Sequence, residues 1–264
     1  MNALVLLDLD GTLYQAGAPV PGAVGAVRRL RAAGHTLRFF TNTDSQATGA
    51  LLERVRGLGF DVEEGELFTP VVAARRVLAG CPGSRSLLLV SAAVREELRD
   101  ACASVGYEEA DRASHVVIGD FRDGLSYAAL DAAFRAVRNG ATLLALQSGR
   151  YFRAQDGAHL DTGAIVAAVE YAAEARARVL GKPSQEFLAA AIDSVRDRLP
   201  VTATWVVGDD RSTDIAMAER AGLRSVQPRT GKHDDQASRG DLPAPQYVIG
   251  SVADLPGLLS GDSA

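Results

Sequence analysis

Residues 3–13 read ALVLLDLDGTL, five apolar residues followed at once by acids, a glycine and a threonine. A short apolar run that ends in turn-forming residues is typical of a buried strand in a parallel sheet. Asp8 and Asp10 alternate with Leu9, so both carboxylates project from the same side of the chain. Ligands of open α/β sheets bind at the carboxyl ends of the strands, so this stretch predicts both a fold class and a site.

Further short runs rich in Leu and Val read as strands, and amphipathic helical patterns lie between them. These strands are predicted at residues 37–40, 87–90, 115–118, 142–146 and 204–207. Val24, Val27 and Leu30 fall on one face of a predicted helix. Regular alternation of strands and helices predicts an α/β fold with right-handed crossovers and a Rossmann-like parallel-sheet core.

Two clusters of Gly and Pro interrupt this pattern, at residues 79–84 and at residues 181–183. Between them lies a self-contained run of strands and helices that is long enough to form a domain. We therefore expect a core domain from residues 1–79 and 178–264, with an inserted α/β cap domain at residues 80–177. Residues 230–245 are polar and rich in Gly, Pro, Asp and Ser, which predicts an exposed loop.

The composition excludes several classes of protein. With 264 residues, 47% of them hydrophobic, the chain is neither disordered nor fibrous. Its 28 basic and 33 acidic side chains give a net charge of −5, which argues against a nucleic-acid partner. Cys81 and Cys102 are too few for a disulfide framework, and no apolar run is long enough for a signal peptide or a membrane span. We expect a cytoplasmic protein without a membrane partner.

Two other positions offer groups that suit a bound anion. Thr41 and Asn42 follow the second predicted strand, where a hydroxyl and backbone N–H groups can hold a phosphoryl oxygen. A helix N-cap is the alternative for this Thr-Asn-Thr stretch. Lys182 stands in a short stiff loop before a helix predicted at residues 184–198, where its ammonium can neutralise an anion. The alternative is an ordinary solvated lysine.

A second group of acids follows the last predicted strand, in the stretch VVGDDRSTD at residues 206–214. Asp209 stands at the strand end and Asp214 begins a helix, so one suits direct binding of a cation and the other suits its waters. Capping of the helix N-terminus is the alternative for Asp210 or Asp214. Acids that meet at one sheet edge predict an Mg²⁺ site, with Thr41 and Lys182 completing a pocket for a dianionic phosphoryl group.

The motif DLDGT, the strand end at Thr41, Lys182 and the motif GDDRSTD occur in the order of the four motifs of the haloacid dehalogenase superfamily of phosphatases. The resemblance covers essentially the whole chain, and the room for a cap between Thr41 and Lys182 resembles subfamily IIA. The stretches GRYF, LDTG and VQPRTGK, at residues 149–152, 160–163 and 226–232, are similar to the phospholysine phosphohistidine inorganic pyrophosphate phosphatase branch. One departure is Pro228 in a short predicted strand, which predicts an edge position for that strand.

The resemblance implies a role for each matched acid. Asp8 would be the nucleophile that forms an aspartyl-phosphate. Asp10 would be the general acid for the leaving oxygen and then the base for the attacking water. Mg²⁺ would be held by the carboxylates of Asp8 and Asp209 and the backbone carbonyl of Asp10. Asp214, or in its place Asp210, would support the ion from outside its direct ligands.

The resemblance also implies the substrate and the partners. Thr41, Asn42 and Lys182 would bind the phosphoryl group, and cap residues would contact the rest of the substrate, namely Arg150, Tyr151, Phe152 and His159. A cap that closes over the site excludes macromolecules. The expected activity is Mg²⁺-dependent hydrolysis of a small phosphorylated substrate, such as a phosphate ester, a phosphoamino acid or pyrophosphate. A homodimer formed through the cap is also implied.

Two other classes of protein share part of this residue set. A receiver-type signalling domain also places acids, a Thr and a Lys around a phospho-aspartate. Such domains are much shorter, put the phospho-acceptor on a middle strand and carry no inserted cap. A catalytically silent phosphate-binding protein would lack one of four residues that are all present here, Asp8, Asp10, Lys182 and Asp209.

Overall fold

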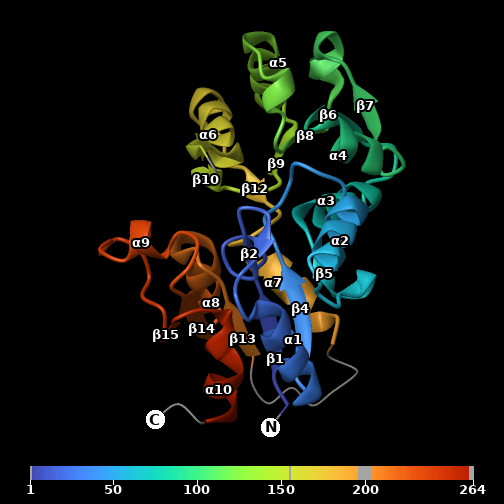
Figure 1. Ribbon diagram of the computed structural model, residues 1–264. Coiled ribbons are helices and arrows are strands. Elements are labelled where there is room, and N and C mark those ends of the chain that lie inside the picture. The colour runs from blue at the N-terminus through green and yellow to red at the C-terminus, as the bar shows by residue number, and fades with distance from the viewer. Residues whose placement is uncertain (1, 155, 196–203, 262–264) are drawn as a thin grey trace. The chain divides into compact units, whose positions relative to one another are not determined.

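The computed structural model describes residues 2–154, 156–195 and 204–261. The chain forms two compact units, each with its own sheet (Figure 1). The first unit comprises Met1–Thr41, Leu52–Phe68 and Pro183–Ala264, and the second comprises Asn42–Leu51 and Thr69–Lys182. Residues 42–51, 69–79 and 178–182 thus group with the second unit, although the sequence assigns them to the core domain. The boundaries of the independently folding domains stay a prediction.

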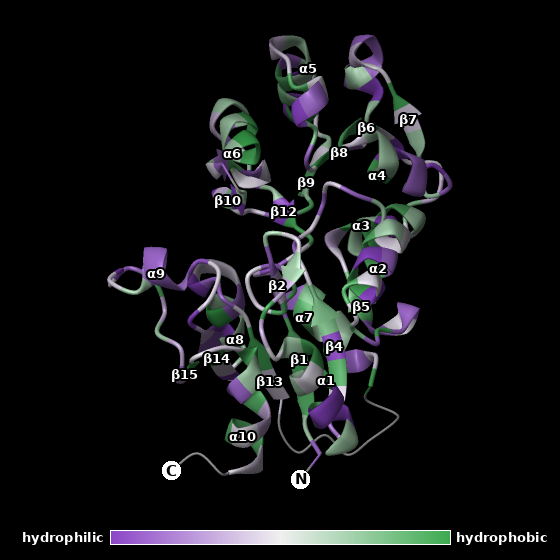
Figure 2. Ribbon diagram, viewed as in Figure 1, coloured by the Kyte–Doolittle hydropathy of each residue, from purple (hydrophilic) through white to green (hydrophobic). Residues whose placement is uncertain are grey.

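A six-stranded parallel sheet lies at the centre of the first unit and confirms the predicted fold class. In spatial order its strands are β15 (Tyr247–Ile249), β14 (Arg224–Pro228), β13 (Thr204–Val207), β1 (Leu4–Leu7), β4 (Thr36–Phe40) and β5 (Leu67–Phe68). β1 is fully buried and is coloured hydrophobic along its length in Figure 2. A strand that is apolar on both faces needs cover on both faces, which is why helices alternate with strands along the chain.

The helices of the first unit are α1 (Ala23–Ala32), α7 (Gln185–Asp193), α8 (Ala216–Arg220), α9 (His233–Gln236) and α10 (Leu255–Ser260), while α2 (Thr48–Gly57) begins in the second unit and ends in the first. α1 buries Val27 and Leu30 as the sequence predicts. α7 ends earlier than the predicted residue 198, and residues 196–198 lie outside the described residues. No helix in the described ranges is long and apolar enough to cross a membrane.

The edge position predicted from Pro228 is wrong. β14 pairs with β13 on one side and with β15 on the other, so it is an internal strand. Pro228 is the last residue of β14, and the next residue supplies the donor, since the Arg229 N–H bonds the Ile249 carbonyl at 2.9 Å. The pairing of β14 with β13 ends at Val226, so Pro228 lies beyond that ladder and its missing N–H breaks no pair there.

The second unit has a five-stranded parallel sheet and a separate hairpin. In spatial order the strands are β12 (Arg178–Val179), β9 (Thr142–Ala145), β8 (His115–Ile118), β6 (Arg85–Leu89) and β7 (Ala103–Val105), and the hairpin is β10 (Tyr151–Ala154) with β11 (Gly157–Leu160). The predicted strands at residues 87–90, 115–118 and 142–146 correspond to β6, β8 and β9. The short strands β7 and β12 were not predicted, because neither carries a run of apolar residues.

Two hydrophobic clusters cover the two faces of this second sheet. Alternate residues of each strand point to opposite faces, so Val116 belongs to one cluster and Val117 to the other. The first cluster includes residues of α5 (Tyr127–Arg138) and α6 (Thr162–Ala173), and the second includes residues of α3 (Pro70–Ala79) and α4 (Ala92–Glu97). The second unit therefore has helices on both sides of its sheet and a core of its own.

Leu144→Ala tests this core. Leu144 is 0% exposed in the cluster that includes α3 and α4. Truncation should lower the free energy of unfolding by about 2–5 kcal/mol, measured by urea denaturation, because it leaves a cavity in a packed interior. Leu125→Ala removes the same atoms from a residue that is 46% exposed in the same unit, and it should cost no more than about 0.5 kcal/mol. Equal losses in the two variants would contradict the packing described here.

Candidate active site

Three buried acids converge at the carboxyl edge of the first unit's sheet. Asp8 follows β1, Asp209 follows β13, and Asp214 lies in the π-helical turn Arg211–Ile215 that precedes α8. One carboxylate oxygen from each acid lies within 4.8 Å of those of the other two. The three residues are 6%, 4% and 2% exposed respectively. The structure thus brings together acids that are about 200 residues apart in sequence, as neighbouring parallel strands require.

The loop after β1 is shaped to hold this cluster. The Asp8 N–H bonds the Val207 carbonyl at 2.9 Å, which extends the pairing of β1 with β13 to the acid itself. The Thr12 hydroxyl donates to Asp8 Oδ2 at 3.1 Å. Gly11 has a φ of +86°, and a β-carbon at this position would overlap the Asp209 carboxylate. Only glycine therefore allows both the turn and the close approach of Asp209.

The electrostatics of the cluster favour a bound cation. Burial, followed by the negative charges of Asp8 and Asp214, raises the pKa of Asp209 well above its ordinary value. Carboxylates this close together relieve their repulsion either by taking up a proton or by sharing a cation. Buried carboxylate oxygens are hard ligands that suit Mg²⁺ or Ca²⁺ better than thiophilic metals. The donor set therefore fits the predicted Mg²⁺.

Asp10 lies two residues beyond Asp8, in the same loop. The residue is exposed at the surface, but desolvation by the surrounding protein and the negative charge of Asp8 raise the pKa of its carboxyl group to about 6. A carboxyl group with this pKa exchanges protons near neutral pH. Such a group is suited to both donating and accepting a proton within one reaction.

Asp210 has a different environment. Burial alone would raise its pKa, but the Lys232 ammonium at 2.8 Å and hydrogen bonds from Ser212 and Gln236 lower that pKa to about 2. Its Oδ1 accepts the Ser212 N–H at the start of the π-helical turn, so Asp210 caps that turn. Asp214, by contrast, belongs to the cluster with Asp8 and Asp209. The capping alternative therefore applies to Asp210.

Thr41 directly follows β4 in the first unit and is 2% exposed. Its backbone N–H donates to the Phe68 carbonyl at 3.1 Å. The helix-cap alternative for Thr41–Thr43 is wrong, because the next helix, α2, begins only at Thr48. The predicted role of the Thr41 hydroxyl, which is to bind a phosphoryl oxygen, stays a prediction.

Lys182 and Asn42 lie together at one end of the second unit. Lys182 is 2% exposed, so the reading as a solvated surface lysine is wrong. The Asn42 amide holds the Lys182 backbone at both of its polar atoms: Nδ2 donates to the Lys182 carbonyl at 3.0 Å, and Oδ1 accepts the Lys182 N–H at 2.7 Å. A β-carbon on Gly181 would crowd Asn42 Oδ1, which explains the glycine before this lysine. Asn42 therefore positions Lys182, a contact across 140 residues that local sequence patterns do not reveal.

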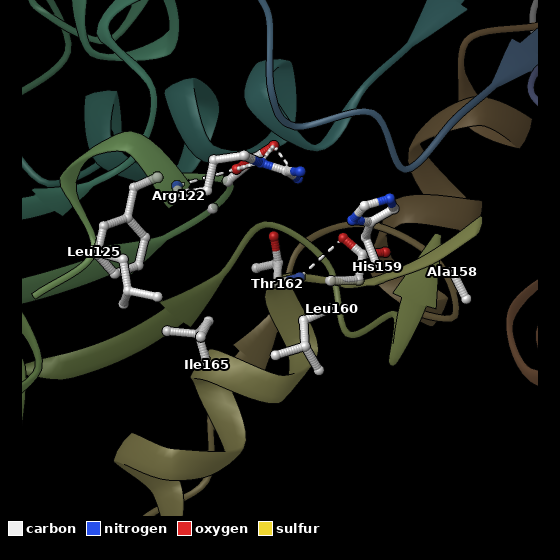
Figure 3. Close-up of a pocket in the computed structure, with 11 residues that line it drawn as sticks. Arg122, Leu125, Ala158, His159, Leu160, Thr162 and Ile165 are labelled. Carbon is white, nitrogen blue, oxygen red and sulfur yellow. Dashed lines mark hydrogen bonds and ion pairs between the residues drawn. The ribbon is translucent and has the colours of Figure 1, made fainter. Parts of the chain in front are cut away.

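The second unit also contains a pocket of about 410 Å³ between the loop after β8 and the start of α6 (Figure 3). Leu125, Leu160 and Ile165 form its apolar wall, and Asp120 and Arg122 contribute charged groups. His159, which the sequence suggests as a cap contact, lines the pocket. The lining residues do not include Arg150 and Tyr151, which the sequence also suggests.

Arg122 continues a stack of side chains beside this pocket. Phe152 and His159 face each other across the hairpin, with ring centroids 5.4 Å apart. The Arg122 guanidinium lies 4.6 Å from the centroid of the Phe152 ring and pairs with Asp120 at 2.7 Å. Asp120 and Arg122 are not among the site residues predicted from the sequence. The sequence feature that could have identified them is the one that identifies Asp8: an acid close behind a predicted strand. Gly119 and Asp120 directly follow the predicted strand at residues 115–118.

A buried polar network lies beside the pocket. The Thr162 hydroxyl donates to Asp44 Oδ2 at 2.7 Å, and Asp161 Oδ1 accepts from Gln147 and from the Thr162 N–H at 2.5 and 2.9 Å. Burial raises the pKa of Asp44 to about 7, and the neighbouring carboxylates of Asp161 and Asp120 add to the shift. Asp44 thus links the segment 42–51 to the first turn of α6 within the second unit.

Asp44→Asn should remove part of the pH dependence of stability. The pKa of Asp44 is raised in the folded state, from 3.8 to about 7, so the folded protein binds the proton more tightly than the unfolded chain does. The contribution of the Asp44 carboxyl group to the free energy of unfolding is fully present below about pH 4. It is lost as the pH rises to about 7. Between these pH values the free energy of unfolding should fall by on the order of 4 kcal/mol in the parent, as measured by urea denaturation at each pH. In Asp44→Asn this fall should be absent. The exposed Asp123→Asn serves as control, and identical pH profiles for all three proteins would contradict the shift.

The chain resembles known proteins along most of its length. Residues 5–106 match the family described as haloacid dehalogenase-like hydrolase, and residues 179–255 match a second HAD-hydrolase-like family. Haloacid dehalogenase-like hydrolase domain-containing protein 2 of Bos taurus is 36% identical over 247 residues, covering 94% of this chain and 92% of that protein. Phospholysine phosphohistidine inorganic pyrophosphate phosphatase of Rattus norvegicus is 35% identical over 234 residues, covering 86% of this chain and 83% of that protein.

Two solved structures of phosphatases have a similar fold. A p-nitrophenyl phosphatase from Archaeoglobus fulgidus superposes with a TM-score of 0.86 at 29% identity, covering 97% of this chain and 98% of that one. A glycerol phosphate phosphatase from Mycobacterium tuberculosis, solved in complex with magnesium, gives a TM-score of 0.82 at 29% identity, covering 96% and 75%. The chain belongs to the haloacid dehalogenase-like hydrolase family.

Proposed function

We propose that the protein is an Mg²⁺-dependent phosphatase that hydrolyses a small phosphorylated substrate through an aspartyl-phosphate. The observation that carries this proposal is the convergence of the buried Asp8, Asp209 and Asp214 carboxylates, with Asp10 two residues from Asp8. Family membership and relatives named as phosphatases of phospholysine, phosphohistidine, p-nitrophenyl phosphate and glycerol phosphate support a phosphatase.

The two acids of the first loop divide the chemistry. In the first step a carboxylate oxygen of Asp8 attacks phosphorus and the bond to the leaving oxygen breaks, while Asp10 gives its proton to that oxygen. In the second step Asp10 takes a proton from a water whose oxygen attacks the same phosphorus, which releases phosphate and restores Asp8. A pKa of about 6 allows Asp10 to hold the proton before the first step and to accept one in the second.

Mg²⁺ bound in this cluster would offset the negative charge of the phosphoryl group and of the acids around it. Asp8 and Asp209 would hold the ion through their carboxylates and Asp10 through its backbone carbonyl, with Asp214 supporting it. The magnesium complex of the Mycobacterium relative supports this choice of ion. Lys182 would supply the second positive charge for the phosphoryl group, and the Thr41 hydroxyl a hydrogen bond.

The family resemblance implies that cap residues in the second unit contact the part of the substrate that does not react. Within that unit, the pocket has an apolar wall that suits a small carbon skeleton. Arg150 and Tyr151 remain predicted substrate contacts. Cytoplasmic location, a homodimer formed through the cap and the absence of nucleic-acid and membrane partners also stay predictions from the sequence.

The direct test is a screen of phosphorylated metabolites with and without Mg²⁺, including pyrophosphate and phosphohistidine. Phosphate release that depends on Mg²⁺ for at least one small substrate would support the proposal. Equal release in the presence of excess chelator would contradict the metal dependence, and no release from any phosphate compound would contradict the activity.

Asp10→Asn separates the two steps of the reaction. The variant keeps the backbone carbonyl of residue 10 but has no acid and no base. Phosphorylation of Asp8 by acetyl phosphate should survive in part, because a leaving group of low pKa needs little protonation. Removal of the phosphoryl group needs the base, so the covalent intermediate should accumulate and appear as added phosphoryl mass in intact-protein mass spectrometry after rapid mixing.

Asp8→Asn is the matched control, because it has no nucleophile and should show neither adduct nor turnover. An adduct in both variants would place the phosphoryl group on another residue. Normal turnover of Asp10→Asn without an adduct would mean that Asp10 is neither the acid nor the base.

Lys182 should be required as a cation. Lys182→Ala should lower kcat/KM by about 10²-fold or more, which is the usual cost of removing one preorganised electrostatic group. Lys182→Arg keeps the charge and, because Asn42 holds only backbone atoms of residue 182, should lose less. Rates near that of the parent for both variants would show that the reaction does not use this ammonium.

A further inference from the structure

A segment far from the first loop in sequence contacts the acid cluster from within the first unit. This segment, Thr230–Lys232, follows β14 and is here called the clamp. The Thr230 hydroxyl donates to the Gly11 carbonyl. The Lys232 backbone N–H donates to Asp209 Oδ2 at 2.7 Å, and the Lys232 ammonium pairs with Asp210 Oδ2 at 2.8 Å. The clamp thus touches both strand-end loops that carry the acids.

Gly231 lies in the middle of the clamp. Its backbone conformation and the space around it do not admit a residue with a side chain. Its φ is +58°, and an added β-carbon would overlap the Asp209 carboxylate and crowd the α-carbon of Gly11. The Asp209 carboxylate therefore lies against backbone on two sides, Gly11 and Gly231. A side chain at either glycine would force the carboxylate to move.

The residues after the clamp are also fixed, which corrects the prediction of a simple exposed loop at residues 230–245. This stretch contains the short helix α9, and the buried Arg211 guanidinium donates to the carbonyls of Gln236, Leu242 and Pro243 at 2.6–2.8 Å. Gln236 also donates to Asp210 Oδ1 at 2.9 Å. The sequence does not predict this anchoring, since an arginine in an acidic motif gives no sign of the carbonyls that it binds.

We propose that the clamp positions Asp209 for metal binding: the Lys232 N–H fixes one oxygen of the carboxylate, and Gly231 leaves the space that the carboxylate occupies. This inference rests on the magnesium site of the proposed function. Partners that orient a ligand without touching the metal commonly contribute about 10–100-fold in metal affinity. The side chain of Lys232 has a separate task, which is to balance the charge of the capping Asp210, whose side chain is only 10% exposed.

The test measures Mg²⁺ binding to the full chain by isothermal titration calorimetry. Gly231→Ala should weaken binding by about 10–100-fold, because the new methyl group displaces the Asp209 carboxylate. Gly222→Ala is the matched control, since Gly222 also has a positive φ, +65°, but open space where its β-carbon would be. It carries the same backbone strain and should bind Mg²⁺ within twofold of the parent.

A second pair of variants isolates the backbone donor. Lys232→Met removes the ammonium and keeps the N–H, whereas Lys232→Pro removes both, at a residue whose φ of −86° is close to what proline allows. We expect Lys232→Pro to bind Mg²⁺ at least tenfold more weakly than Lys232→Met. In turnover assays, the Mg²⁺ concentration for half-maximal rate should rise by the same factor, while kcat at saturating Mg²⁺ recovers. A purely structural defect would not recover in this way.

The outcomes separate the clamp from the proposed function. If the parent binds no Mg²⁺, both the magnesium site and the clamp are wrong. If the parent binds Mg²⁺ and Gly231→Ala equals Gly222→Ala, only the clamp is wrong. Should Gly231→Ala fail to fold by circular dichroism, the comparison of Lys232→Pro with Lys232→Met decides, and equal affinities in that pair would overturn the proposal.

Discussion

Mutual repulsion among the buried Asp8, Asp209 and Asp214 carboxylates is the constraint around which the first unit is organised. Parallel pairing of β1 with β13 forces the acids that follow these strands to the same sheet edge. Water is largely excluded there, so the charges are poorly screened and the cluster raises the free energy of the fold unless a cation or a proton is taken up. Buried like charges of this kind lower the stability of the fold, and the same oxygens could hold a metal ion. The glycines at positions 11 and 231 permit the approach, since each leaves room for the Asp209 carboxylate.

The two lysines near the acids and the predicted phosphoryl pocket, Lys232 and Lys182, are also held by specific contacts. Lys232 and Lys182 have long flexible side chains, which lose entropy when they are fixed. In both cases the structure fixes the backbone of the lysine rather than its side chain alone: the Lys232 N–H bonds Asp209, and the Asn42 amide bonds the Lys182 N–H and carbonyl. An ammonium that starts from a fixed backbone has fewer arrangements to lose when it meets an anion. Preorganisation of this kind is what electrostatic catalysis requires.

The sequence predicts the features that depend on local pattern together with one topological rule. Parallel strands read as apolar runs, and acids at their carboxyl ends must meet, so Asp8 and Asp209 could be placed at one site without coordinates. What the sequence does not reveal is which distant groups hydrogen-bond. The contact of Asn42 with Lys182 spans 140 residues, and the contact of Lys232 with Asp209 joins a loop to a strand end. At Pro228 a general rule fails: proline favours edge strands, but Pro228 is the last residue of β14, an internal strand of the sheet.

The two short acidic stretches also show why the number of acids in a motif says little about their tasks. Asp209 and Asp210 are adjacent, yet their pKa values move in opposite directions, because one faces other carboxylates and the other faces the Lys232 ammonium and the donors of Ser212 and Gln236. Asp210 is therefore a charged cap whose charge Lys232 balances, whereas the repulsion at Asp209 is relieved by a proton or a cation. Lys232 contacts both acids in different ways: its backbone N–H donates to Asp209, and its ammonium donates to Asp210. A carboxylate held by a neutral N–H keeps its charge available to a metal, while a carboxylate paired with an ammonium does not.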